Sequence, residues 1–145
     1  MTLSLLVLTT FVASALARPF LVRVPRVGAW IVAAIPAALF VCFMLLGSGA
    51  PVVETLSWVP SLGVELTFRL DGFSLLFCLL ITGIGTLVTL YAGAYFAEKP
   101  PEKGASFIAL ILLFMGAMLG TVLSDNLIVL FVFWELTSLV SFLLI

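Results

Sequence analysis

The sequence has no histidine, few charged residues and only two cysteines. Of its 145 residues 9% are charged, and the net charge is −1, whereas soluble domains carry about 25% charged residues. Without histidine, imidazole chemistry is excluded, and the usual zinc sites would need histidine or a Cys-x-x-Cys pair. So few basic residues in a net negative chain also give no electrostatic support for binding nucleic acid.

The two cysteines do not indicate a disulfide or a redox site. Cys42 and Cys78 each lie inside an apolar run, where a single thiol usually behaves as a small apolar side chain. The sequence also contains no phosphate-binding loop, no nucleophile–base set and no cofactor motif. We therefore expect no enzyme of the soluble type, no cofactor and no metal site.

Long apolar runs dominate what remains. Hydrophobic residues make up 64% of the chain, and a membrane helix needs about 20 of them to cross some 30 Å of hydrocarbon. The sequence therefore predicts an all-α integral membrane protein with about five transmembrane helices in a single bundle over residues 1–145. The five apolar segments are residues 2–17, 27–46, 72–97, 104–124 and 126–145.

The first segment has two interpretations. The tripeptide at residues 15–17, Ala-Leu-Ala, resembles a signal-peptidase site, and the run before it has about the length of a signal h-region. However, no basic residue precedes the run, whereas Arg18, Arg23 and Arg26 follow it. Positive charge on this flank favours a helix that is retained and starts outside the membrane.

The basic residues predict the orientation of the whole chain. If residues 18–26 are cytoplasmic, residues 47–71 lie outside and residues 98–103 lie inside. The second inner loop then carries Lys99 and Lys103, in agreement with the positive-inside rule. We expect a multi-pass protein of the cell (inner or plasma) membrane, in contact with the lipid bilayer, with its N-terminus outside.

The long outer loop contains a strand pattern. Residues 64–70, "VELTFRL", alternate strictly between apolar and polar side chains, which is typical of a half-buried strand. The preceding "ETLSWV" supplies a partner, and residues 60–63 supply turn-forming residues. We expect a small extracytoplasmic β-hairpin between the second and third helices, with Glu54, Glu65 and Arg69 as solvated charges.

Glu135 is the residue most suggestive of function. It lies about 14 Å along the fifth apolar segment from Asn126, close to the bilayer midplane. A carboxylate there is costly unless it is protonated, paired with a cation or facing water inside the protein. Each of these states would let Glu135 relay protons or ions. The alternative is a protonated glutamate that only hydrogen-bonds a neighbouring helix.

Two hydroxyl residues near Glu135 are candidates to support it. Ser138, three residues on, shares its helix face, and Thr137 projects from an adjoining side. Such residues in membrane helices more often hydrogen-bond the backbone. Elsewhere, Asp71 and Asp125 are expected to cap helix starts, while the Gly116 and Gly120 pair predicts close helix packing.

The C-terminal end of the sequence falls inside the fifth apolar run. Ile145 has neither a basic stop nor a polar tail after it. Two explanations are open: the sequence is the front piece of a longer polypeptide, or a short chain closes against partner proteins. We expect the former, in which residues 1–145 form the N-terminal bundle of a longer subunit.

From Phe114 onward the chain resembles the A subunit of the multisubunit Mrp-type Na⁺/H⁺ antiporter. The stretch "FMGAMLGTVLSDNLIVLFVFWELTSLVSFLLI" carries this resemblance, which extends upstream through "LDGFSLLF" and "YAGAYF". That protein belongs to an antiporter-like family shared with the membrane arm of respiratory complex I. In the family, a glutamate in a Trp-Glu context on the fifth helix is implicated in ion translocation, and it matches Glu135 here.

The resemblance implies cation/proton antiport by a hetero-oligomeric membrane complex, with Na⁺, or Na⁺ together with K⁺, exchanged for H⁺. The family's relay lysines lie on later, broken helices, and this chain has only Lys99 and Lys103 in the predicted inner loop. Two alternatives stay open. One is a proton-translocating subunit of a complex I-like or membrane-bound hydrogenase assembly, and the other is a non-catalytic scaffold subunit.

Overall fold

The computed structural model describes residues 2–59 and 64–145, with residues 25, 26, 59 and 64 described by backbone alone. Five helices and a two-stranded antiparallel hairpin make up this part of the chain. The helices are α1 (Thr2–Arg23), α2 (Pro25–Leu46), α3 (Gly72–Tyr95), α4 (Pro101–Leu123) and α5 (Leu127–Leu144), and the strands are β1 (Val52–Val59) and β2 (Val64–Leu70).

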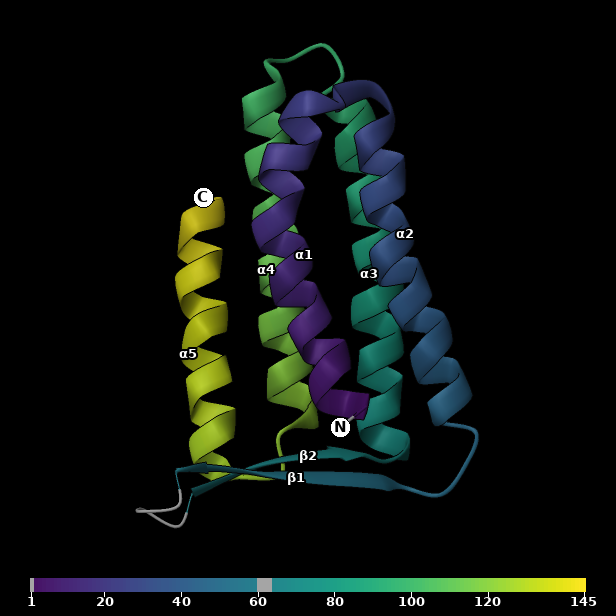
Figure 1. Ribbon diagram of the computed structural model, residues 1–145, viewed down its shortest axis with the longest axis vertical. Coiled ribbons are helices and arrows are strands. Elements are labelled where there is room, and N and C mark those ends of the chain that lie inside the picture. The colour runs from purple at the N-terminus through teal and green to yellow at the C-terminus, as the bar shows by residue number, and fades with distance from the viewer. Residues whose placement is uncertain (1, 60–63) are drawn as a thin grey trace.

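All five helices are long and apolar enough to cross a membrane. This result, together with the hairpin between α2 and α3, confirms the predicted fold class. The helices run side by side, and the hairpin lies across one end of the bundle, near the N-terminus (Figure 1). We call this the hairpin end, and we call the opposite end, formed by the α1–α2 turn and the α3–α4 loop, the basic end.

Two helices extend beyond the apolar segments that predict them. Helix α1 continues from Ala17 through Pro19 to Arg23, and α4 begins at Pro101 rather than at Gly104. Charged residues at helix ends can reach the membrane surface with their long side chains, so a helix need not stop where its apolar run stops. Proline at the first position of α4 suits a helix start, because its missing N–H would have no partner there.

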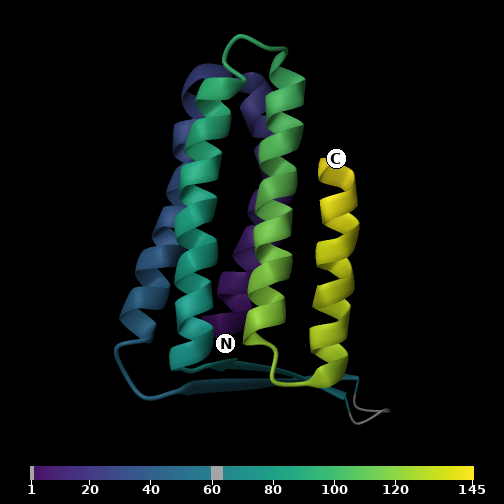
Figure 2. The ribbon, with the colours of Figure 1, turned by 180° about the vertical axis from the view of Figure 1, so that it is seen from behind.

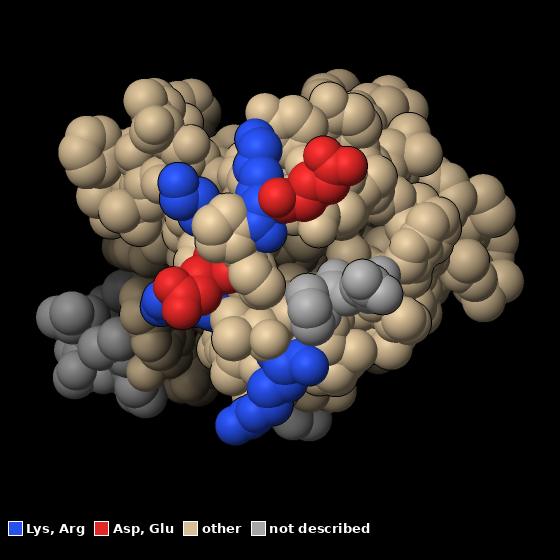
Figure 3. Space-filling model, turned by 90° about the horizontal axis from the view of Figure 1, so that it is seen from above, with Lys and Arg blue, Asp and Glu red and all other residues tan. Residues whose placement is uncertain are grey.

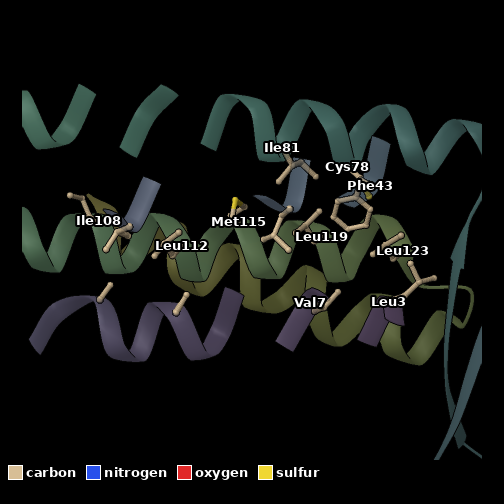
Figure 4. Close-up of a cluster of buried hydrophobic side chains, with 14 of the residues drawn as sticks. Leu3, Val7, Phe43, Cys78, Ile81, Ile108, Leu112, Met115, Leu119 and Leu123 are labelled. Carbon is tan, nitrogen blue, oxygen red and sulfur yellow. The ribbon is translucent and has the colours of Figure 1, made fainter. Parts of the chain in front are cut away.

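The core of the bundle is centred on α4. Helix α4 packs against α1, α3 and α5, while α2 packs chiefly on α3. Figure 4 shows a line of buried α4 side chains facing α1 on one side and α2 and α3 on the other. The labelled core residues are Leu3, Val7, Phe43, Cys78, Ile81, Ile108, Leu112, Met115, Leu119 and Leu123.

The two glycines of α4 allow close approach by two different helices. A Cβ atom at Gly116 would collide with the Thr10 hydroxyl of α1, and one at Gly120 would collide with the Phe133 ring of α5. Small residues of this kind let membrane helices pack closely. The glycine pair therefore does serve packing, with one glycine for each neighbouring helix.

The hairpin covers the hairpin end with its apolar side. Phe68 and Leu70 of β2 are buried, whereas Glu65 and Arg69, at the alternate positions, are exposed. The alternation predicted for residues 64–70 is therefore confirmed. β1 begins at Val52, and the predicted turn at residues 60–63 lies outside the described residues.

Glu54 of β1 is not the solvated loop charge that we expected. It is 9% exposed and accepts hydrogen bonds from the Leu3 N–H (2.8 Å) and the Ser4 hydroxyl at the start of α1. Desolvation raises the pKa of this carboxyl, but the bonds from Ser4 and Leu3 outweigh it and lower the pKa overall. Glu54 thus anchors α1 to the hairpin.

Candidate functional site on helix α5

Helix α5 starts at the hairpin end, where β2 positions it. The N–H of Asp125 donates to the carbonyl of Thr67 (2.9 Å), and Ser124 pairs with Phe68 in an isolated antiparallel bridge. The side chain of Asn126 then caps the helix by accepting from the Ile128 N–H (2.9 Å). The backbone of β2 therefore sets the point at which α5 enters the bundle.

One of the two predicted aspartate caps is correct. Asp71 caps α3 in a capping box with Ser74, and the donated hydrogen bonds, chiefly from the Ser74 N–H, lower its pKa. Asp125 is not the cap of α5, since Asn126 takes that position one residue later. Asp125 instead lies 3.9 Å from the Arg69 guanidinium, which also pairs with Asp71 at 3.6 Å.

Helix α5 stands at the side of the bundle and contacts chiefly α4 (Figures 1 and 2). Its inward side places Phe133 over Gly120, and it buries Val129 and Val140. The rest of the helix is open: only 11% of its most apolar stretch is buried, against 44% for α4. Most of the surface of α5 is therefore left uncovered by the described residues.

Glu135 lies in the middle of this helix and on its open side. It is eight residues after the start at Leu127 and nine before the end at Leu144, about 12 Å from the hairpin end of the helix. The neighbours predicted to share its face, Ile128, Phe131 and Phe142, are all more than half exposed, and Ser138 is exposed as well. An apolar face with one central carboxyl group thus points away from α4.

The hydroxyl groups predicted to support Glu135 bond elsewhere. Thr137 donates to the Trp134 carbonyl at 2.6 Å, and Ser138 lies 3.5 Å from the same carbonyl oxygen. Among the described residues, no hydrogen bond or ion pair reaches the Glu135 carboxyl group. The structure therefore brings Thr137 and Ser138 close to each other in α5 but does not join either to Glu135.

The two lysines of the chain lie at the basic end, far from Glu135 along the helix axis. Lys99 places its ammonium group 3.8 Å from the centre of the Tyr95 ring, which stacks on Tyr91. Lys103 is exposed in the first turn of α4. Within the described chain, no cluster of three metal-binding side chains is present. The site on α5 therefore consists of one carboxyl group in an apolar surface.

Sequence reasoning did not identify Glu54, although a signal was present. β1 and β2 pair so that Glu54 lies opposite Phe68, and directly opposite residues of an antiparallel pair share one face of the sheet. Once this register is known, Glu54 must lie on the same buried side as Phe68. The alternation in residues 64–70 alone does not reveal it, because the register depends on the turn.

Comparisons with known proteins give one consistent result. The family model described as "NADH-Ubiquinone oxidoreductase (complex I), chain 5 N-terminus" matches residues 56–103. The A subunit of the Na⁺/H⁺ antiporter of Alkalihalophilus pseudofirmus is 56% identical over 120 residues, and the A1 subunit of the Staphylococcus haemolyticus antiporter is 53% identical over the same length. Each of these matches covers 80% of this chain and 15% of the relative.

A solved structure supports the same assignment. A chain in the structure of the Mrp complex from a Dietzia species superposes with a TM-score of 0.89 at 32% identity, over 98% of this chain and 15% of that one. The chain therefore spans about 15% of the length of the proteins it matches. The matches place it in the antiporter-like family shared by Mrp A subunits and complex I chain 5, where it corresponds to the N-terminal part of an Mrp A protein.

Proposed function

We propose that this chain takes part in monovalent cation/proton antiport within a multisubunit membrane complex, and that Glu135 is the proton- or ion-carrying group. The observation that supports this most directly is the position of Glu135 at the middle of an apolar helix, without a partner among the described residues. The relatives named as Na⁺/H⁺ antiporter proteins of the A type support the type of transport.

The physical chemistry of the site explains why it can carry a proton. A carboxylate among hydrocarbon costs a few kcal/mol on insertion scales, and protonation or pairing with a cation removes most of that cost. The two states of Glu135 therefore respond to whatever covers its face. A cation that approaches from the uncovered side would favour the ionised form, and its withdrawal would favour uptake of a proton.

The orientation belongs to the same proposal. The basic end carries Arg18, Arg23, Lys99 and Lys103, whereas Arg69 is the basic residue at the hairpin end. By the positive-inside rule the basic end is cytoplasmic, so the N-terminus and the hairpin lie outside. Glu135 then stands midway between the two aqueous phases of a cell membrane.

Replacing Glu135 with Gln in the complete assembly tests the function. Gln keeps the shape and can hydrogen-bond but cannot ionise, so cation-driven pH change in vesicles should fall to background while the amount of assembled complex stays the same. Glu65→Gln is the matched control, because Glu65 is exposed in the hairpin. Normal exchange by Glu135→Gln would instead identify Glu135 as a helix-packing group and the chain as a scaffold protein.

The match to complex I chain 5 favours a second candidate, proton translocation driven by a redox reaction. The two candidates differ in what accompanies the chain. Iron–sulfur or flavin proteins in the purified assembly would support the redox-driven pump, and proton movement would then require an electron donor. Exchange that responds to Na⁺ or K⁺ gradients in an assembly without redox groups supports the antiporter.

A further inference from the structure

A groove at the basic end joins two arginines of α1 to the start of α4. It has a volume of about 480 Å³ and is lined by Arg18, Pro19, Val22, Arg23 and Glu102. Figure 3 shows this end of the molecule, where basic side chains are spread over the surface beside fewer acidic ones. Its volume lies within the range of about 300–1,000 Å³ that is usual for small-molecule sites.

The two arginines in this groove have no ionic partner in the described chain. The carboxylate of Glu102 lines the same groove, yet no ion pair within 4.0 Å joins it to either arginine. Two guanidinium groups and one carboxylate leave the groove with a net charge of +1. Arg18 also lines an adjoining groove with Lys103, which adds a further positive charge nearby. The electrostatics of this region therefore favour an anion.

An apolar stripe on α1 leads along the helix to the groove. Leu5, Leu8, Val12 and Leu16 are each about half exposed or more, and their spacing of three or four residues places them on one side of the helix. Arg23 follows Leu16 by seven residues, or about two turns, so it lies on the same side roughly 10 Å further along. A ligand with an acidic head and long apolar tails would match both features.

We propose that the groove binds the phosphate headgroup of an anionic phospholipid, with the acyl chains lying along the α1 stripe. Guanidinium groups bind phosphate oxygens in bidentate geometry, and long basic side chains at helix ends reach the headgroup level of the bilayer. Basic pockets between membrane helices are known to hold acidic lipid headgroups. The proposal concerns the lipid and does not depend on which ion the complex transports.

Lys99 supplies the matched control for this proposal. It lies at the same end of the molecule, but its ammonium group is placed over the Tyr95 ring and it does not line the groove between α1 and α4. Neutralising Lys99 therefore removes one charge from the basic end and leaves the groove unchanged. A general attraction of the basic end for acidic lipid and a defined site at Arg18 and Arg23 then predict different results.

The experiment counts bound lipids on the complete assembly by native mass spectrometry. Complexes are purified from the membrane, incubated with mixed phosphatidylglycerol and phosphatidylcholine micelles, and compared at equal assembly. Arg18→Gln/Arg23→Gln should retain at least fivefold less phosphatidylglycerol than the wild-type complex, with phosphatidylcholine unchanged. Arg18→Lys/Arg23→Lys and Lys99→Gln should each stay within twofold of the wild type. Inorganic phosphate added during incubation should not displace the lipid.

Three outcomes would overturn the proposal. The Gln double variant could retain as much phosphatidylglycerol as the wild type, which would remove the site. Lys99→Gln could lose as much as the double variant, which would indicate diffuse attraction. Finally, the double variant could assemble poorly while its intact complexes keep their lipid, which would mean that the arginines pair with carboxylates of the assembly.

Discussion

Helices α4 and α5 are neighbours of similarly apolar composition, yet their environments are opposite. In α4, the line of residues from Ile108 to Leu123 is enclosed by α1, α2, α3 and α5, while α5 rests on α4 and leaves most of its surface open. The same contrast holds for two glutamates. Glu54 is buried and bonded to the start of α1, whereas Glu135 lies on the open face of α5 with no partner among the described residues.

This contrast shows that local satisfaction separates structural from functional groups here. Where a carboxylate has its partners within the chain, as Glu54 does, it stabilises the fold. Where a costly carboxylate lacks them, as Glu135 does, its state depends on something outside this part of the protein. The following changes test whether the region of α1–α4 and the hairpin is self-sufficient and whether α5 is not.

The largest effect is expected from removing a buried side chain of α4. Leu112 is fully buried, so Leu112→Ala should leave a cavity and lower the free energy of unfolding by about 2–5 kcal/mol. Leu139 of α5 is 61% exposed, and Leu139→Ala should cost no more than about 0.5 kcal/mol. Denaturation of the detergent-solubilised protein measures both, and equal costs would contradict the difference in packing.

Neutralising the two glutamates should affect stability very differently. Hydrogen bonds to a charged group are worth about 1.5–3 kcal/mol, so Glu54→Gln should destabilise the protein by roughly this amount. Glu135→Gln should change stability by less than about 0.5 kcal/mol, because it removes no contact among the described residues. Melting temperatures of both variants against the wild type decide this.

The Glu54 contribution should also depend on pH. Its pKa in the folded protein lies below the ordinary value of 4.5, so the stabilisation is present above that value and is lost as pH falls through the folded-state pKa. Wild-type and Glu54→Gln stabilities should therefore converge in acid. If the difference between them is constant from neutral to acidic pH, the carboxylate is not the stabilising form.

The contact between the two regions can be tested at Gly120. A side chain there would overlap the Phe133 ring of α5, and overpacking of this kind costs about 1–3 kcal/mol. Gly120→Leu should therefore destabilise the protein and separate α5 from α4. Gly72→Leu is the matched control, since a Cβ atom at Gly72 meets nothing within 4 Å. Cross-linking of α4 to α5 should fall in the first variant only.

The smallest effect is expected from single hydroxyl groups. Ser14 of α1 donates to the Ala109 carbonyl of α4 at 2.8 Å, and interhelical bonds of this type average about 0.6 kcal/mol in membrane proteins. Ser14→Ala should cost about that much, whereas Ser138→Ala on the open face of α5 should cost nothing measurable. A larger loss at Ser138 would mean that α5 is more tightly held than its exposure indicates.

The sequence by itself determined the five spans, the hairpin and the importance of Glu135. Hydrocarbon length, charge and alternation act locally along the chain, so these features can be read from residue order alone. The extension of α1 to Arg23 was not predicted, because a helix end depends on side chains that reach beyond the hydrocarbon. The cap of α5 was placed one residue early, at Asp125 instead of Asn126.

Only the tertiary structure decided which apolar surfaces are covered and which charges are satisfied. Lipid and protein interiors are similarly apolar, so composition cannot distinguish the enclosed α4 from the open α5. The burial of Glu54 depends on strand register, and its partners at Leu3 and Ser4 are about 50 residues away along the chain. Such contacts arise when distant segments meet, and that is why the two glutamates looked alike in cost but differ in role.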